Sequence, residues 1–150
     1  MKTTDDLTQV LLNTDTDGLE AALRQQQASM LDGERPFADY MRELIRSKGL
    51  RQQEVFLAAD LPEGYGYKLL GEERHTRRRD TILRLCFAAH CTVDEAQRAL
   101  KLQGLSPLYA RLERDAALIV ALNRGMFEIA DVNAYLEQHG FDPLAPCGRL

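Results

Sequence analysis

The sequence predicts an all-α fold. Apolar residues recur at the i, i+3, i+4 spacing that places them on one helical face, most regularly in the stretch that begins at Pro36. Glycines and capping residues divide these stretches into helix-like lengths, and no stretch alternates apolar and polar residues as a half-buried strand does. With 150 residues, 45% of them hydrophobic, the chain is long enough to bury one core of domain size.

Residues 1–33 predict an N-terminal arm of two short helices joined by a polar turn. Asp17 stands three residues before Glu20, a spacing akin to a capping box at the start of the second helix. The apolar stripe of that helix is thin and consists of Leu19, Leu23 and Met30. Because so narrow a stripe is not self-sufficient, we expect the arm to pack on the main domain or on a second chain, and the sequence leaves both open.

Five further helices are predicted between residues 34 and 103. The first starts at Pro36, which suits a first turn because its missing N–H would be unpaired there, and it stops before Gly49. The second is Gln52–Ala59, and a tight turn joins it to the third, about Glu63–Leu70. Asp80 is expected to cap the fourth helix, and a capping box, Thr92 with Glu95, starts the fifth.

Residues 104–150 predict a C-terminal helix pair. Ser106 and Pro107 form an N-cap and first-turn signature, so we expect a long helix from there to about Asn123. Its segment Ala116–Leu122 is apolar almost all round, which indicates burial on more than one side. This extension is therefore expected to pack on the preceding domain or on a second chain.

Positive charge is concentrated near the third predicted helix. The chain carries a net charge of −4, yet Met41–Arg84 holds ten cations and seven anions, so this stretch is at +3 and the remainder at −7. The basic run Arg74–Arg79 follows the third helix directly. Taken alone, such a run is more often a solvated loop than a site that grips phosphates.

No catalytic or metal-binding constellation is recognisable. Cys86, His90 and Cys91 have the best ligand spacing, but a structural zinc site needs four ligands and no second Cys/His pair follows. A glycine-rich phosphate loop, paired carboxylates in a cleft and a nucleophile with a nearby base are all missing from the pattern. We therefore expect neither an enzyme nor a cofactor.

Membrane and export signals are also missing from the sequence. No apolar run approaches the roughly 18–20 residues of a membrane span, and Met1-Lys2 is followed by polar residues instead of the apolar core of a signal peptide. The three cysteines make an odd count that does not indicate a disulfide framework. We expect a soluble, cytoplasmic protein with free thiols and no membrane partner.

Five short motifs follow one another between Phe37 and Leu102. They are Gly49-Leu50-x-Gln52, the turn at Leu61, the helix Tyr65-Gly66-Tyr67-Lys68-Leu69-Leu70, the start Arg78-Arg79-Asp80 and the box Thr92-Val93-Asp94-Glu95. In this order they resemble the lambda-repressor-like (Cro/C1, XRE-type) helix-turn-helix domain. Ser106-Pro107-Leu108-Tyr109 and Asp115–Leu122 extend the resemblance to a bacterial subgroup with added N- and C-terminal helices.

The resemblance implies a DNA-binding transcriptional regulator that acts as a homodimer on double-stranded DNA. Its recognition helix, Glu63–Leu70, would enter the major groove, and two such helices would lie about one helical turn apart. The arm and Ala116–Leu122 would be the candidate dimer surfaces. The expected DNA contacts are Gln52 and the arginines on phosphates and the recognition-helix residues on base edges: Gln52, Glu63, Tyr65, Tyr67, Lys68, Arg74, Arg77, Arg78 and Arg79. Tyr65 and Tyr67 are equally compatible with partial burial in the core.

Three departures from the family pattern leave a second hypothesis open. The family usually has a small residue where Phe56 lies and glycine where Asp60 lies, so an altered turn between the two helices is expected. The front of the recognition helix, Pro62-Glu63-Gly64, lacks the residues that commonly read bases. An interaction module on a degenerate helix-turn-helix scaffold, acting as an anti-repressor or sequestering partner, fits these departures and the acidic chain.

Overall fold

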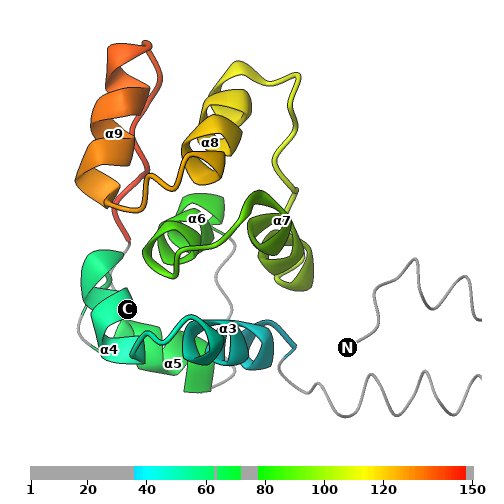
Figure 1. Ribbon diagram of the computed structural model, residues 1–150, viewed down its shortest axis with the longest axis vertical. Coiled ribbons are helices and arrows are strands. Elements are labelled where there is room, and N and C mark those ends of the chain that lie inside the picture. Colours follow the sequence, from blue (N-terminus) through cyan, green and yellow to red (C-terminus); the bar gives the residue numbers. More distant parts are fainter. Residues whose placement is uncertain (1–35, 63, 72–77, 148–150) are drawn as a thin grey trace, which may run out of the picture. The chain divides into compact units, whose positions relative to one another are not determined.

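The computed structural model describes residues 36–62, 64–71 and 78–147, and in these ranges it contains helices and no strand (Figure 1). The all-α prediction is confirmed for this part of the chain, whereas the two helices predicted for residues 1–33 lie outside it. The helices in the described ranges are α3 (Pro36–Ser47), α4 (Gln52–Ala58), α5 (Tyr65–Gly71), α6 (Arg79–Ala88), α7 (Val93–Leu102), α8 (Glu113–Asn123) and α9 (Ile129–Gln138). None of these helices has the length and apolar character needed to span a membrane.

Helix α6 is the centre of the compact unit that runs from Phe37 to Leu150. Every side chain from Thr81 to Ala88 is buried, because α6 packs against α4, α7 and α9 at once. Helices α3, α4 and α5 lie at one end of this unit and α8 and α9 at the other, with α6 and α7 between them (Figure 1). Residues 104–147 therefore share one core with the five helices before them.

Six helix ends in the described ranges are closed by the same hydrogen-bonded turn. At the end of α3, Gly49 adopts φ 72°, and the Leu50 N–H donates to the Ile45 carbonyl at 3.1 Å, as in a Schellman motif with an apolar residue after it. Two ends use a residue other than glycine, since Asp60 has φ 57° and His90 has φ 60°. The remaining left-handed residues at these ends are Gly104, Gly125 and Gly140.

The predicted cap of α6 is wrong. This helix begins at Arg79, and the capping position is Arg78, which makes no side-chain capping bond. The Asp80 carboxylate instead accepts hydrogen bonds from Arg114, at 3.0 and 3.2 Å, and from the N–H of Ala145 at 2.9 Å. A charge-assisted bidentate bond is stronger than a cap, so the distant arginine determines the position of this carboxylate.

The predicted start of the long C-terminal helix is also wrong, because α8 begins at Glu113 and not near Ser106. Leu108 is buried, and the Gln97 side chain bonds both its N–H, at 2.7 Å, and its carbonyl, at 2.8 Å. These bonds from α7 satisfy the backbone that a helix would otherwise pair internally, so the chain stays extended. By contrast, the capping box of α7 is confirmed by reciprocal Thr92 and Glu95 bonds of 2.8 and 3.2 Å.

Candidate nucleic-acid interface

The joint between α4 and α5 is a short turn held by backbone bonds. Asp60 closes α4 in the left-handed conformation, and the Leu61 N–H donates to the Phe56 carbonyl at 3.1 Å. Leu61 itself is buried, which anchors the turn in the core. Although Asp60 replaces the glycine that the resemblance implied, it adopts the backbone conformation that glycine favours, as Asp residues do more readily than most others.

Helix α5 has one buried side and one exposed side. Tyr65, Leu69 and Leu70 lie in the core, with Tyr65 only 8% exposed. Tyr67 is 52% exposed, and Lys68 is partly exposed beside it. Of the four expected contacts on this helix and its front, Tyr67 and Lys68 are thus accessible and Tyr65 is not, while Glu63 lies outside the described residues.

A large residue on α4 packs beside a glycine on α5. Phe56 is buried, and its ring packs edge-on against Tyr67 with 4.9 Å between ring centroids. The ring occupies the space beside Gly66, where an added Cβ would lie 2.4 Å from the nearest ring carbons. Gly66 therefore makes room for Phe56, and the aromatic residue that departs from the family pattern is accommodated within the helix pair.

Gln52 lies at the start of α4 and opens onto the surface. It borders a shallow hollow of about 500 Å³ whose other lining residues come mainly from α3: Asp39, Arg42, Glu43, Ile45, Arg46 and Leu50. The two arginines in this lining are already paired, Arg42 with Asp39 at 2.6 Å and Arg46 with Glu43. The Gln52 side chain therefore lies beside two arginines whose charges are neutralised by acidic partners.

The structure describes Arg78 and Arg79 of the basic run, and it assigns a structural role to Arg79. Arg74 and Arg77 lie outside the described residues, and Arg78 is exposed at the start of α6. Arg79 is engaged by the C-terminal extension: its guanidinium donates to both Asp115 oxygens, at 2.7 and 2.8 Å, and to the carbonyls of Ser106 and Pro107, each at 2.9 Å. These four bonds give Arg79 a structural role.

Asp115 is a residue whose importance the sequence analysis missed. It is 3% exposed, and it accepts the N–H of Tyr109 at 3.0 Å in addition to the Arg79 guanidinium. Burial alone would raise the pKa of its carboxyl, but the bonds from Arg79 and Tyr109 outweigh burial and lower that pKa. The sequence does contain a signal for this pairing, the dipeptide Arg-Asp repeated at 79–80 and 114–115. In the structure, the arginine of each dipeptide pairs with the aspartate of the other.

A second missed residue, Arg84, ties the C-terminal segment to the end of α4. It is 5% exposed and donates to three carbonyls: that of Ala59 at 3.3 Å, that of Leu144 at 2.8 Å and that of Ala145 at 2.8 Å. A buried arginine satisfied by carbonyls alone is uncommon, since most are paired with a carboxylate. Its position makes residues 144–145 part of the support beneath the α4–α5 joint.

Cys86, His90 and Cys91 take part in packing. Cys86 and Cys91 are fully buried free thiols, and the pKa of Cys86 is raised by its hydrogen bond with Cys91 and by burial, which keeps that thiol protonated. The His90 ring stacks on Phe127 with 4.4 Å between centroids. Within the described residues, no three His, Cys, Asp or Glu side chains gather as metal ligands would.

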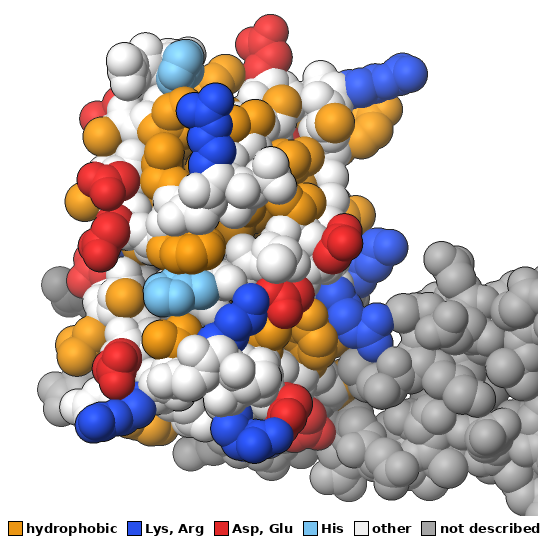
Figure 2. Space-filling view, in the orientation of Figure 1, with side chains coloured by type: hydrophobic (Ala, Val, Ile, Leu, Met, Phe, Trp, Pro, Cys, Tyr) orange, Lys and Arg blue, Asp and Glu red, His pale blue; other side chains and the backbone are white. Residues whose placement is uncertain are grey.

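The surface in Figure 2 carries acidic and basic side chains interspersed among apolar ones, with no region of one sign dominating this face. Searches against protein-family models, curated proteins and solved structures found no match to the chain.

Proposed function

We propose that the chain is a DNA-binding transcriptional regulator that uses α4 and α5 as a helix-turn-helix of the lambda-repressor-like kind. The observation that carries this proposal is the pairing of two short helices through a tight turn closed by Asp60, with Tyr67 and Lys68 exposed on the second helix. Helix α6 packs against α4, and the buried residues of α3, α4, α5, α6 and α7 belong to one core, which supports the proposal.

The exposed groups suit a phosphate backbone and a groove edge. Gln52 at the start of α4 presents an amide donor, which suits a phosphate oxygen, and Lys68 supplies a cation that suits guanine O6 and N7 or a phosphate. Tyr67 offers an aromatic edge and a hydroxyl. The run Arg74–Arg78 would add the salt-dependent part of the affinity, and Arg79 is left out of this set because Asp115 holds it.

Binding to a random-sequence DNA pool tests the proposal, measured by fluorescence anisotropy across a series of salt concentrations. We expect an affinity that falls with salt, and Lys68→Ala or the pair Arg77→Ala/Arg78→Ala should each reduce the magnitude of the salt slope by about one for every phosphate that is no longer neutralised. Arg111→Ala is the matched control, since Arg111 is exposed near α8, away from α4 and α5. Failure of the wild-type chain to bind or select any DNA at low ionic strength would refute the proposal.

A protein-binding module is the second candidate, favoured by one observation. Leu57 on α4 is 73% exposed, close in sequence to Phe56, whose ring contacts the exposed Tyr67. Exposed apolar side chains mark a protein-binding surface where they form a contiguous patch, so this candidate requires that Leu57 and Tyr67 contact the partner together. A complex with another protein that survives Arg77→Ala/Arg78→Ala but is abolished by Leu57→Asp would support this candidate over DNA binding.

A further inference from the structure

Helix α8 carries an outward face that no described residue covers. Leu112 just before the helix is 55% exposed and Val120 in its third turn is 39% exposed, and Tyr109 from the preceding turn is 53% exposed. Ala116 lies between Leu112 and Val120 at the i+4 position, so the three form one stripe. Most of the large hydrophobic side chains that are exposed in the described ranges belong to this region; the other two are Leu57 and Tyr67.

Two residues of opposite charge flank this stripe on the same side, one at each end of α8. Glu113 is in the first turn of α8 and Arg124 caps its last turn, and both are exposed. Eleven positions separate them, so at 100° per residue they differ by only about 20° around the helix. Neither takes part in an ion pair within the described part of the chain.

We infer that α8 pairs with α8 of a second copy of this chain in the antiparallel direction. In a two-fold antiparallel pair, an edge of one helix meets the same edge of the other, so each Glu113 would face Arg124 of the partner subunit. Ala116 near the centre is small enough for the helices to approach closely, and Leu112 and Val120 would be covered. A parallel pair would not bring these two charges together.

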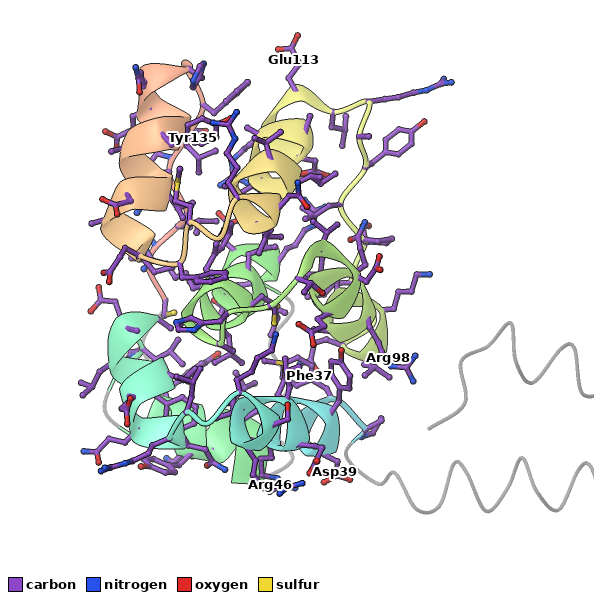
Figure 3. The ribbon with its side chains drawn as sticks, viewed as in Figure 1. Phe37, Asp39, Arg46, Arg98, Glu113 and Tyr135 are labelled. Atoms are coloured by element: carbon purple, nitrogen blue, oxygen red, sulfur yellow. The ribbon has the colours of Figure 1, made fainter. Side chains whose placement is uncertain are left out.

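Antiparallel pairing of α8 determines where the two α5 helices lie. Glu113 lies at the end of the unit opposite Asp39 and Arg46 of α3, and α5 lies at the α3 end (Figures 1 and 3). Helix α8 runs from that far end back toward α6 (Figure 1). An antiparallel pair would therefore direct the two α5 helices away from each other, unlike the adjacent recognition helices that the resemblance implied. The pairing does not depend on the proposed function.

Charge reversal tests the pairing, with sedimentation equilibrium of the full chain as the measurement. We expect the wild type to dimerise reversibly, and Glu113→Arg or Arg124→Glu alone to raise the dimer dissociation constant about tenfold or more, because two ion pairs become like-charge contacts. An equimolar mixture of the two variants should restore the wild-type constant, since a mixed dimer regains both ion pairs. Glu137→Arg, an exposed change on α9, is the control for a simple loss of acidic charge.

Several results would overturn the inference. These are a wild type that remains monomeric at every concentration, single reversals without effect, and a mixture that fails to restore dimerisation. Circular dichroism of each variant checks that α8 still folds. A photo-crosslinker introduced as Leu112→p-benzoylphenylalanine identifies the occupant directly: we expect a bond to the region of Arg124 in a second chain, and a bond to residues 1–35 of the same chain would show that the arm covers the face instead. DNA binding plays no part in these measurements, so they succeed or fail separately from the proposed function.

Discussion

The guanidinium of Arg79 donates two hydrogen bonds to the buried carboxylate of Asp115, at 2.7 and 2.8 Å. Beside this pair, the Arg114 guanidinium on the α8 side donates two hydrogen bonds to the carboxylate of Asp80 on the α6 side, at 3.0 and 3.2 Å. The starts of α6 and α8 are thus joined by two crossed, bidentate ion pairs between adjacent Arg-Asp dipeptides. Because α6 packs on α4 as well, this connection links the C-terminal helices to the proposed DNA-binding pair.

Loss of the Asp115 charge should weaken the whole unit. We expect Asp115→Asn to lower the free energy of unfolding by roughly 2 kcal/mol, because Arg79 loses its charged acceptor in a mostly buried position. Urea denaturation followed by circular dichroism measures this. Asp131→Asn is the matched control, since Asp131 also lies in the first turn of its helix but is exposed, and we expect a loss below about 0.5 kcal/mol there. Equal losses at the two positions would contradict a special role for the Arg79 pair.

Acid should remove the same stabilisation. The pKa of Asp115 is lowered from its ordinary value of 3.8, so the folded chain holds this carboxyl deprotonated more strongly than the unfolded chain does. The resulting contribution is fully present above the unfolded pKa and is lost as the pH falls through the lower, folded pKa. Unfolding free energies measured from about pH 6 down to about pH 2 should decline, and the decline should be shallower in Asp115→Asn. Parallel pH profiles would show that other carboxylates, such as Glu95, account for the acid sensitivity.

Because the Phe56 ring lies beside Gly66, the effect of Gly66→Ala on stability should change sign when Phe56 is removed. Gly66→Ala in the wild type should cost about 1–3 kcal/mol of stability, because the new methyl group meets the Phe56 ring at 2.4 Å. In a Phe56→Ala background that clash is absent, and the same substitution should stabilise by up to about 1 kcal/mol through helix propensity. Thermal or urea unfolding of the four proteins completes the cycle. Additive effects would argue that the ring and the glycine are independent.

Arg84 should be needed for the C-terminal segment to stay in place. Arg84→Met keeps an unbranched apolar stem but removes the guanidinium, so the carbonyls of Ala59, Leu144 and Ala145 lose their donor at a cost of about 2–4 kcal/mol. Hydrogen exchange should then accelerate at the amides of Leu144 and Ala145, whose own bonds go to Asn133 and Asp80. Arg111→Met, at an exposed position, is the control. Unchanged protection at both amides would mean that Leu144, buried in the core, suffices to anchor the segment.

Most helices were predictable because their signals are local. The start of α3 at Pro36, its end before Gly49 and the capping box of α7 depend on residues within one turn of the helix terminus, and all three are confirmed. The α4–α5 pair was predicted from the same kind of signal. The second tyrosine of α5 is exposed and the first is buried, a distinction that the sequence left open, because burial depends on the packing of the whole helix.

The sequence by itself determined that the described part of the chain is helical and where most of its helices end. Only the tertiary structure decided where α6 and α8 begin and what Arg79 does. The reason is the distance over which the competing bonds act: Asp80 and Ser106 both carry local capping signals worth about 1 kcal/mol. Bonds from residues distant in the sequence outweigh those signals. Arg114 holds the Asp80 carboxylate through two bonds, and the Gln97 side chain and Arg79 bind the backbone of Leu108 and Ser106 in place of a helix.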